Sequence, residues 1–174
     1  MQNKVNFSGS YVALITPMTT DGKVDFDALK KLVNWHVESG TDGLVILGTT
    51  AESATLELQE QLDVLNAVIE VNQNRLPVIV GNGSNSTAET IKKTQLLDGL
   101  DIDGFLTVTP YYNKPTQKGM VAHFTAVAKV TNKPIILYNV PGRTGVDLDN
   151  QSVVELMNID NIVGIKDATG DVSR

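Results

Sequence analysis

The feature of the sequence that most constrains its fold is a regular alternation of apolar runs and helical patterns. Six short runs rich in valine, isoleucine and leucine lack the polar–apolar alternation of a half-exposed strand, which is typical of strands covered on both faces in a parallel sheet. They cover residues 11–18, 43–50, 77–83, 104–112, 134–140 and 162–169. Helical spacing of apolar residues predicts helices between them, at 25–39, 57–72, 86–98, 116–131 and 149–158. The alternation predicts a parallel α/β fold.

Short motifs mark the boundaries of these elements. Ser86 and Glu89 form the S-x-x-E pattern of a capping box, which predicts a helix start. Residues 40–43 and 101–104 both place aspartate and glycine directly before an apolar run. These residue types suit tight turns, so we expect a turn before each of the two strands.

Two architectures fit the alternation. The strands recur about every 30 residues, which is the size of one βα unit. A closed eight-stranded barrel needs about 250 residues, whereas 174 residues suit an open, doubly wound sheet. Length alone favours the open sheet. We expect one domain over residues 1–174, because no linker or low-complexity tract interrupts the chain.

Composition argues against several classes of function. The formal net charge of −6 argues against nucleic-acid binding, which requires a basic face. The chain has no cysteine for disulfide or thiolate chemistry, and His36 and His123 are too few for a histidine-rich metal site. The N-terminal stretch lacks the pattern of a secretory signal, and no run approaches about 18 apolar residues. We therefore expect a cytoplasmic protein.

Polar residues follow the apolar runs, and the carboxyl ends of parallel strands meet at one edge in both architectures. They offer one amine, three phenols, one guanidinium and several hydroxyl groups, without a histidine, a cysteine or a cluster of carboxylates. This set favours binding of a carbonyl compound that carries a carboxylate. Its members are Thr16, Thr49, Thr50, Glu52, Ser84, Tyr111, Tyr112, Tyr138, Asn139, Arg143 and Lys166.

Lys166 at the end of the last apolar run has two interpretations. Simple alternation places Ile162, Gly164 and Lys166 on one face of the strand, with Val163 and Ile165 on the other. A desolvated lysine is a free-amine nucleophile toward ketones. A lysine that extends from a strand end to water is the alternative, and position alone favours it.

The other candidate site residues also have both a structural and a functional interpretation. Tyr138 suits a proton relay, although position favours a ring in the core with its hydroxyl in water. Thr49 and Glu52 match S/T-x-x-E, so they predict a helix start, and the same geometry makes an anion site. Arg143 lies in a turn, where it binds a carboxylate or water. Residues 81–86 match a nucleotide-binding glycine pattern only weakly, and rather predict a turn and a cap.

Four motifs taken together resemble the pyruvate-dependent class I aldolase-like enzymes, and within them the dihydrodipicolinate synthase family. The motifs are GTTAESATL (48–56), TVTPYYNKP (107–115), YNVPGRTG (138–145) and GIKDATG (164–170). The resemblance runs from about Phe7 to Arg174. It implies a TIM (β/α)8 barrel, of which about six βα units are present here and the last strands and a C-terminal helical extension are absent.

The resemblance also implies a reaction. Lys166 would form a Schiff base with pyruvate, and the resulting enamine would attack aspartate-4-semialdehyde, on the route to lysine through diaminopimelate. The implied proton-relay triad is Thr49, Tyr138 and, from a neighbouring subunit, Tyr112. The protein is thus expected to be a lyase that needs no cofactor and no metal, and to form a homo-oligomer, either a dimer or a tetramer.

Two further residues would bind the substrates in this family. Thr50 would hold the carboxylate of pyruvate, and Arg143 would hold that of aspartate-4-semialdehyde. N-acetylneuraminate lyase and the keto-deoxy-sugar aldolases share the lysine and the tyrosine, so Arg143 favours the synthase over these relatives.

The sequence departs from the family in two places. Ala51 stands where the family usually has glycine, so a methyl group is added near the expected pyruvate site. Four residues match the lysine-binding regulatory site of some members, whereas Leu58 and Gln61 stand where some of those members have histidine. Regulation by lysine therefore stays open, and its candidate residues are Ser53, Asn85, Glu89 and Tyr111.

The length leaves other functions open. An incomplete barrel exposes strand edges and apolar faces. We expect them to be covered by a complementary C-terminal fragment or by other copies, or else to belong to a truncated, inactive product. A non-catalytic barrel fragment is thus the alternative to an enzyme, and a binding domain built on an open sheet is a third.

Overall fold

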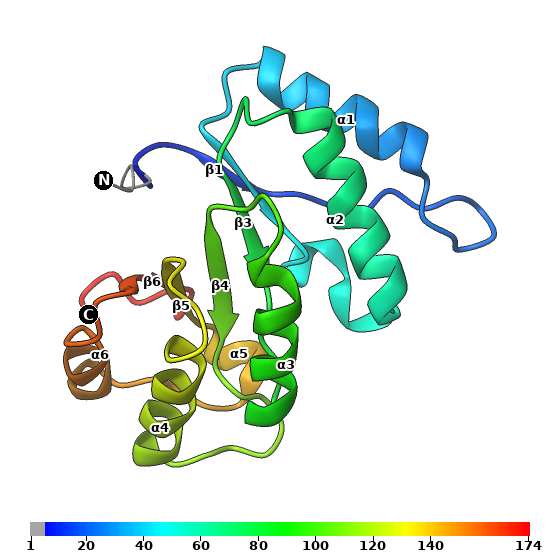
Figure 1. The fold of residues 1–174 in the computed structure, drawn as a ribbon. Coiled ribbons are helices and arrows are strands. Elements are labelled where there is room, and N and C mark those ends of the chain that lie inside the picture. Colours follow the sequence, from blue (N-terminus) through cyan, green and yellow to red (C-terminus); the bar gives the residue numbers. More distant parts are fainter. Residues whose placement is uncertain (1–5) are drawn as a thin grey trace. The chain divides into compact units, whose positions relative to one another are not determined.

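The structure is a computed structural model that describes residues 6–174. Its strands and helices alternate as the sequence predicts (Figure 1). The chain divides into two compact units. The first consists of residues 6–81 with Asp101–Asp103, and the second of Asn82–Leu100 with Gly104–Arg174.

The first unit contains three parallel strands in sequence order and two long helices that pack against each other. Val45 pairs with Ala13 on one side and with Ile79 on the other. Apolar residues on α1 and α2, among them Val33 and Leu65, are fully buried. The elements are β1 (Tyr11–Ala13), α1 (Phe26–Glu38), β2 (Gly43–Ile46), the 3₁₀ turns η1 (Thr49–Ala51) and η2 (Ser53–Thr55), α2 (Leu58–Asn72) and β3 (Val78–Gly81).

The helix start predicted at Thr49 is wrong. Only two 3₁₀ turns form there, and Glu52 between them has a left-handed backbone with φ 54°. That conformation interrupts a right-handed helix. The α-helix α2 begins instead at Leu58, where Glu57 and Glu60 form a reciprocal capping box.

The two aspartate–glycine turns form as predicted, and their aspartates also bind backbone. Asp42 accepts a hydrogen bond from the backbone N–H of Ser10 (2.7 Å) and donates its own N–H to the Ser10 carbonyl (3.1 Å). Asp103 makes the same pair of bonds with Val78, at 2.7 and 2.8 Å. Each carboxylate therefore satisfies a backbone donor at the start of a strand.

The second unit contains the parallel strands β4, β5 and β6, also in sequence order. Helix α3 packs against α4, and α4 against α6. Ser86 caps α3 by accepting from the Glu89 N–H, as predicted. The elements are α3 (Thr87–Asp98), β4 (Gly104–Val108), α4 (Gln117–Ala128), β5 (Ile135–Asn139), α5 (Pro141–Thr144), α6 (Asn150–Leu156) and β6 (Ile162–Asp167).

Strand β6 contains one extra residue. The register pairs Ile162 with Ile135 and Gly164 with Ile136, so Val163 has no partner position on β5. Such a bulge shifts the side-chain alternation of a strand by one position. The face of Ile162 predicted from simple alternation is therefore wrong.

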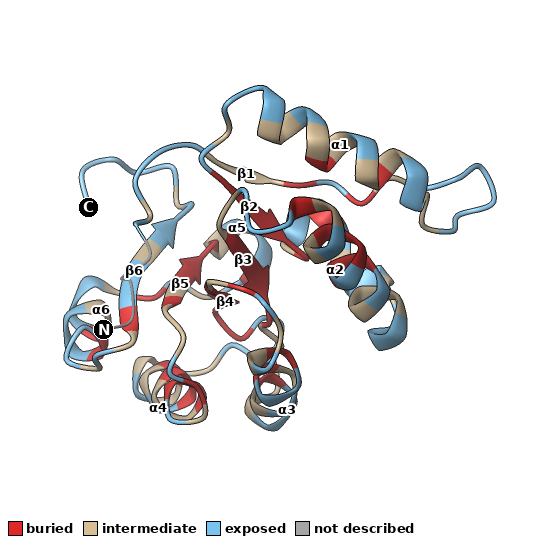
Figure 2. Cartoon of the chain, turned by 45° about the horizontal axis from the view of Figure 1, so that its top comes forward, coloured by how far each residue is buried: buried red, intermediate tan, exposed pale blue. Residues whose placement is uncertain are grey.

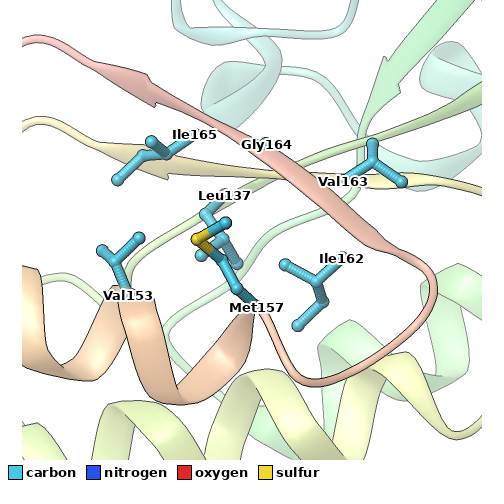
Figure 3. A pocket seen from close by; sticks show the side chains of 7 residues that line it. All are labelled: Leu137, Val153, Met157, Ile162, Val163, Gly164 and Ile165. Carbon is cyan, nitrogen blue, oxygen red and sulfur yellow. The ribbon is translucent and has the colours of Figure 1, made fainter.

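The bulge changes which side chains of β6 lie on the same face of the sheet. Ile162 and Ile165 are the register partners of Ile135 and Leu137, so they share a face, and both are among the residues that line a pocket beside α6 (Figure 3). Gly164 and Lys166 lie on the opposite face, and Lys166 is the register partner of Tyr138 on β5.

Burial is uneven within the second unit. Most of β4 and β5 is buried, whereas most of β6 is exposed (Figure 2). No helix in residues 6–174 is long and apolar enough to cross a membrane.

Candidate active site

Lys166 and Tyr138 form the best-defined pair of reactive groups in the second unit. They lie on neighbouring strands at their carboxyl ends, and the Lys166 Nζ is 4.6 Å from the centre of the Tyr138 ring. The tyrosine is 8% exposed, so its ring is held in the core, while Lys166 is exposed. A cationic ammonium over a phenol face is attracted by the ring quadrupole, and this attraction favours the position of Nζ over the ring.

The space along the stem of Lys166 is open. Gly164 lies two residues earlier on the same face, and a Cβ built on it would meet no atom within 4 Å. A side chain at this position would not contact the Lys166 stem, so the expectation that glycine makes room for the lysine stays a prediction. The desolvation expected for a lysine nucleophile is not present in this structure, because the Lys166 side chain is exposed.

A buried asparagine connects the ends of β5 and β6 on the face away from the pair. The Asn139 Nδ2 donates to Asp147 Oδ1 at 2.8 Å and more weakly to Asp167 Oδ2 at 3.4 Å. Its Oδ1 accepts from the Leu148 N–H at 3.0 Å. Asn139 directly follows Tyr138, and Asp167 directly follows Lys166. The network therefore positions the backbone that carries both reactive groups.

Arg174 adds two charge-assisted bonds to this network. Its guanidinium donates to both oxygens of Asp147, at 2.7 and 2.8 Å, and lies 3.8 Å from Asp167. The hydrogen bond from Thr169, with smaller effects of Asn139 and Arg174, lowers the pKa of Asp167 below its usual range. Sequence reasoning assigned no role to these aspartates, because their shared contacts with Asn139 and Arg174 exist only once β5 and β6 are paired.

Arg143 lies on α5, a single helical turn directly after β5, and its side chain is exposed. The loop that carries Tyr112 is tied to this turn, because the Tyr112 N–H donates to the Thr144 carbonyl at 3.2 Å. Tyr112 is 86% exposed and has a left-handed backbone, with φ 73°. The structure thus brings these two candidate loops together and leaves the phenol of Tyr112 free of the core.

The regulatory candidates of this unit lie on adjoining segments. Asn113 donates to the Asn85 carbonyl at 3.0 Å, which ties the loop of Tyr111 to the segment before α3. Tyr111 is 37% exposed. Glu89, in the first turn of α3, pairs with Lys92 at 3.1 Å.

Thr49 and Thr50 lie on η1 in the first unit, and both are exposed. Their turn follows a strained residue: Leu47 has φ 58°, a conformation that a bulky side chain rarely adopts. The Leu47 carbonyl also lies so close to Gly81 that a Cβ there would be 2.2 Å from its oxygen. Sequence reasoning missed this strain, because nothing in the composition of the stretch signals it.

The methyl group of Ala51 is accommodated. Ala51 is 2% exposed, belongs to η1 and does not have a positive φ, so glycine is not required for its backbone. Its carbonyl accepts a hydrogen bond from the buried Thr16 hydroxyl at 2.8 Å. Of the other candidates in this unit, Ser53 donates to the Gly48 carbonyl at 3.3 Å, and Leu58 is 52% exposed.

Known proteins are similar in sequence over nearly the whole chain. The model of the dihydrodipicolinate synthetase family matches residues 6–174. The 4-hydroxy-tetrahydrodipicolinate synthase of Pseudoalteromonas atlantica is 55% identical over 168 residues, which cover 97% of this chain. The chain belongs to the dihydrodipicolinate synthetase family. It spans 57% of that relative's length.

Solved structures of the dihydrodipicolinate synthetase family have the same fold. The chloride-inhibited dihydrodipicolinate synthase of Acinetobacter baumannii, complexed with pyruvate, has a TM-score of 0.95 at 53% identity, over 97% of this chain and 58% of that one. The lysine-bound enzyme of Cyanidioschyzon merolae has a TM-score of 0.92 at 39% identity, over 96% and 56%. The fold is of the TIM (β/α)8 barrel type, and this chain holds about six βα units of it.

No group of three or more histidine or acidic residues within 6–174 is arranged to hold a metal ion. His123 is buried between helices: its Nδ1 is 2.9 Å from the Thr87 hydroxyl, and its Nε2 has no hydrogen-bond partner among the described residues. Burial lowers the pKa of His123 to about 4, so this ring is neutral near pH 7.

Proposed function

We propose that this protein acts as a 4-hydroxy-tetrahydrodipicolinate synthase, condensing pyruvate with aspartate-4-semialdehyde in lysine biosynthesis. The observation that carries the proposal is the placement of the Lys166 amine beside the Tyr138 ring, in a chain 53% identical to a synthase complexed with pyruvate. An amine on one strand end and a phenol on the next supply the nucleophile and the proton donor that imine chemistry needs.

The reaction proceeds in four steps. The neutral Lys166 amine attacks the ketone of pyruvate, and loss of water gives an imine. The imine loses a proton from the methyl group to give an enamine, whose carbon bonds to the aldehyde carbon of aspartate-4-semialdehyde. The amino group of that substrate then displaces Lys166 from the imine carbon, which closes the ring and regenerates the enzyme. Tyr138, Thr49 and a partner subunit's tyrosine equivalent to Tyr112 carry the protons.

Substrate binding rests on two side chains. Thr50 holds the pyruvate carboxylate at η1, and the exposed guanidinium of Arg143 holds the carboxylate of the second substrate. A guanidinium that reaches solvent on α5 can present two donors to one carboxylate. This assignment favours the synthase over N-acetylneuraminate lyase.

Further parts of the proposal concern assembly and regulation. The exposed phenol of Tyr112 suits insertion into a second subunit, within a homodimer or homotetramer. Lysine binds at the regulatory candidates, a suggestion supported by the lysine-bound relative from Cyanidioschyzon merolae. We also propose a single, partial barrel domain over residues 1–174 and a cytoplasmic location. The regulatory candidates are Ser53, Asn85, Glu89 and Tyr111.

Reduction with borohydride in the presence of pyruvate tests the proposal. We expect a stable adduct on Lys166, located by peptide mass spectrometry. Lys166→Arg is the matched control, because it keeps a cation beside the Tyr138 ring and removes the nucleophilic amine. Labelling of another lysine, or no adduct on protein that is folded by circular dichroism, would contradict the proposal.

A non-catalytic barrel fragment is the second candidate. The exposure of Lys166 favours it, because a lysine nucleophile is expected in a desolvated site and this side chain reaches water. If the adduct forms only after a C-terminal segment of a relative is added, the chain is an incomplete enzyme rather than an inert one.

A further inference from the structure

The side chain of Lys114 crosses the end of the turn that carries Arg143. That turn is α5, and Gly145 is its C-cap. A Cβ built on Gly145 would lie 3.1 Å from the Lys114 Cε and 3.9 Å from its Cγ, so the lysine stem runs over this glycine. Lys114 and Arg143 are both exposed. Because Arg143 is only two residues from Gly145, the two cations belong to one small region of the surface.

The loop that carries Lys114 is held in an unfavourable conformation. Tyr112 and Lys114 have left-handed backbones, with φ 73° and 46°, which residues other than glycine rarely adopt. The Tyr112 N–H donates to the Thr144 carbonyl at 3.2 Å, and the Asn113 side chain donates to the Asn85 carbonyl at 3.0 Å. Strain of this kind persists where the surroundings fix it, and it is common at ligand-binding sites. The backbone of Lys114 is therefore fixed beside α5.

The charges of Lys114 and Arg143 are not compensated. Within residues 6–174, neither side chain forms a hydrogen bond or an ion pair. Asp147 lies two residues beyond Gly145, but its carboxylate is paired with Arg174 at 2.7 Å. Two unpaired cations beside one turn produce a local positive field in a chain whose formal net charge is −6.

This field lies at the edge of the sheet where Lys166 is found. Helix α5 directly follows β5, in which Tyr138 is the register partner of Lys166. The loop of Lys114 follows β4, which pairs with β5 on its other side. The carboxyl ends of parallel strands meet at one edge, so Lys114, Arg143 and Lys166 lie on the same side of this unit.

We propose that Lys114 is a specificity residue that acts with Arg143 to draw carboxylate-bearing ketones to Lys166 in preference to neutral ketones. The attraction needs no contact, because the field of an exposed charge extends over the Debye length, about 8 Å at physiological ionic strength and about 30 Å in 0.01 M salt. Such fields raise the rate at which charged ligands arrive. The inference deepens the proposed function, and it rests on that function for the reaction at Lys166.

A first measurement tests the field without pyruvate. The Lys166 amine attacks the ester carbonyl of N-hydroxysuccinimide acetate, expels the hydroxysuccinimide anion and loses a proton to water. The sulfonated form of the reagent reacts in the same way and carries an added negative charge. Peptide mass spectrometry gives the rate at Lys166 for each reagent, in about 0.01 M salt. We expect Lys114→Gln to lower the ratio of the sulfonated to the plain rate about threefold or more, and Lys114→Arg to restore it.

The matched control is Lys129→Gln. Lys129 is exposed and lies at the far end of α4, so this variant loses the same charge away from the loop of Lys114. We expect the rate ratio in this variant to change less than about 1.5-fold. In about 1 M salt the Debye length falls to about 3 Å, so the effect of Lys114→Gln should also disappear.

A second measurement compares pyruvate with its neutral methyl ester in borohydride trapping on Lys166. Both reactions use the same reductant, so the ratio of their rates reports the ketone alone. We expect Lys114→Gln to slow the trapping of pyruvate about threefold or more, and to change that of methyl pyruvate less than about twofold.

Three results would overturn the inference. They are an unchanged reagent ratio in Lys114→Gln, an equal change in Lys129→Gln, and equal slowing of pyruvate and its methyl ester. If the wild-type chain forms no pyruvate adduct, the proposed function fails instead. The acetylation ratio then still decides whether the field of Lys114 reaches Lys166.

Discussion

The Lys166 Nζ lies 4.6 Å from the centre of the Tyr138 ring, on two strands whose register contains one extra residue at Val163. The pairing of these strand ends, rather than the sequence motif around either residue, is what puts an amine beside a phenol. The buried Asn139 and the aspartates it contacts hold the same strand ends from the opposite face.

Replacing Tyr138 separates the two roles of its side chain. Tyr138→Phe keeps the ring beside Lys166 and removes the hydroxyl, so we expect the free energy of unfolding to change by less than about 1 kcal/mol. Tyr138→Ala removes a buried ring and should cost about 3–5 kcal/mol. Urea unfolding measures the change in the free energy of unfolding of both variants.

The same variants test the proton relay. If the hydroxyl moves protons, Tyr138→Phe traps pyruvate with borohydride more slowly than the wild type, despite its native stability. Equal trapping rates in the two proteins would remove the hydroxyl of Tyr138 from the proposed mechanism.

Thr107 and Thr109 form a matched pair of fully buried hydroxyls. Thr107 donates to Asn82 at 2.7 Å, whereas the Thr109 hydroxyl has no partner among the described residues. Thr107→Val leaves the Asn82 oxygen without this donor, and we expect a loss of about 1–3 kcal/mol. Thr109→Val removes an unsatisfied group, so stability should be unchanged or higher by up to about 1 kcal/mol. Similar losses in urea unfolding of both variants would contradict the assigned network.

Gly81 is expected to tolerate no side chain. A Cβ there would lie 2.2 Å from the backbone oxygen of Leu47, so Gly81→Ala must displace the strained turn before Thr49. We expect a loss of about 1–3 kcal/mol or more in the free energy of unfolding. Gly99→Ala is the control: its Cβ would meet nothing within 4 Å and its φ is −78°, so a small gain is expected. A thermal midpoint of Gly81→Ala at or above that of Gly99→Ala would refute this prediction.

Stability should depend on pH through His123. Its pKa is about 4 in the folded chain and near 6.5 when unfolded, so the unfolded state binds more protons between these values. The stabilisation is therefore complete above pH 6.5 and is lost as the pH falls toward 4, by about 1–3 kcal/mol. Urea unfolding at a series of pH values measures the slope.

The control for this prediction is His123→Gln, which cannot titrate. We expect a flatter pH dependence between 6.5 and 4.5 in this variant. His36 contributes in the same direction, because burial lowers its pKa as well. Asp149 and Asp167 titrate below this window, since their pKa values lie below the usual range. An unchanged slope in His123→Gln would exclude His123 as the cause.

Local sequence determined most of the elements. The six apolar runs became six strands, and the helical patterns became helices within a few residues of their predicted bounds. Hydrophobic periodicity and caps such as Asp25 on α1 act over a few residues, so they can be read without the fold. Resemblance of four motifs identified the family, which the family model and the relatives confirm.

The prediction of which β6 side chains share a face failed, because a bulge is defined by the pairing of two strands. Val163 is extra only relative to β5, and no residue type within β6 marks it. The prediction of a helix start at Thr49 and Glu52 also failed, because Glu52 has a left-handed backbone that its residue type does not signal.

The sequence by itself determined which residues form strands and helices, and it supplied Lys166 and Tyr138 at the ends of two strands. Tertiary structure alone decided that their side chains meet, that Asn139 ties the same ends together, and that an apolar pocket stays open beside β6. Propensity and periodicity are local, whereas register, strain and contact depend on backbone hydrogen bonds and packing between segments far apart in the chain.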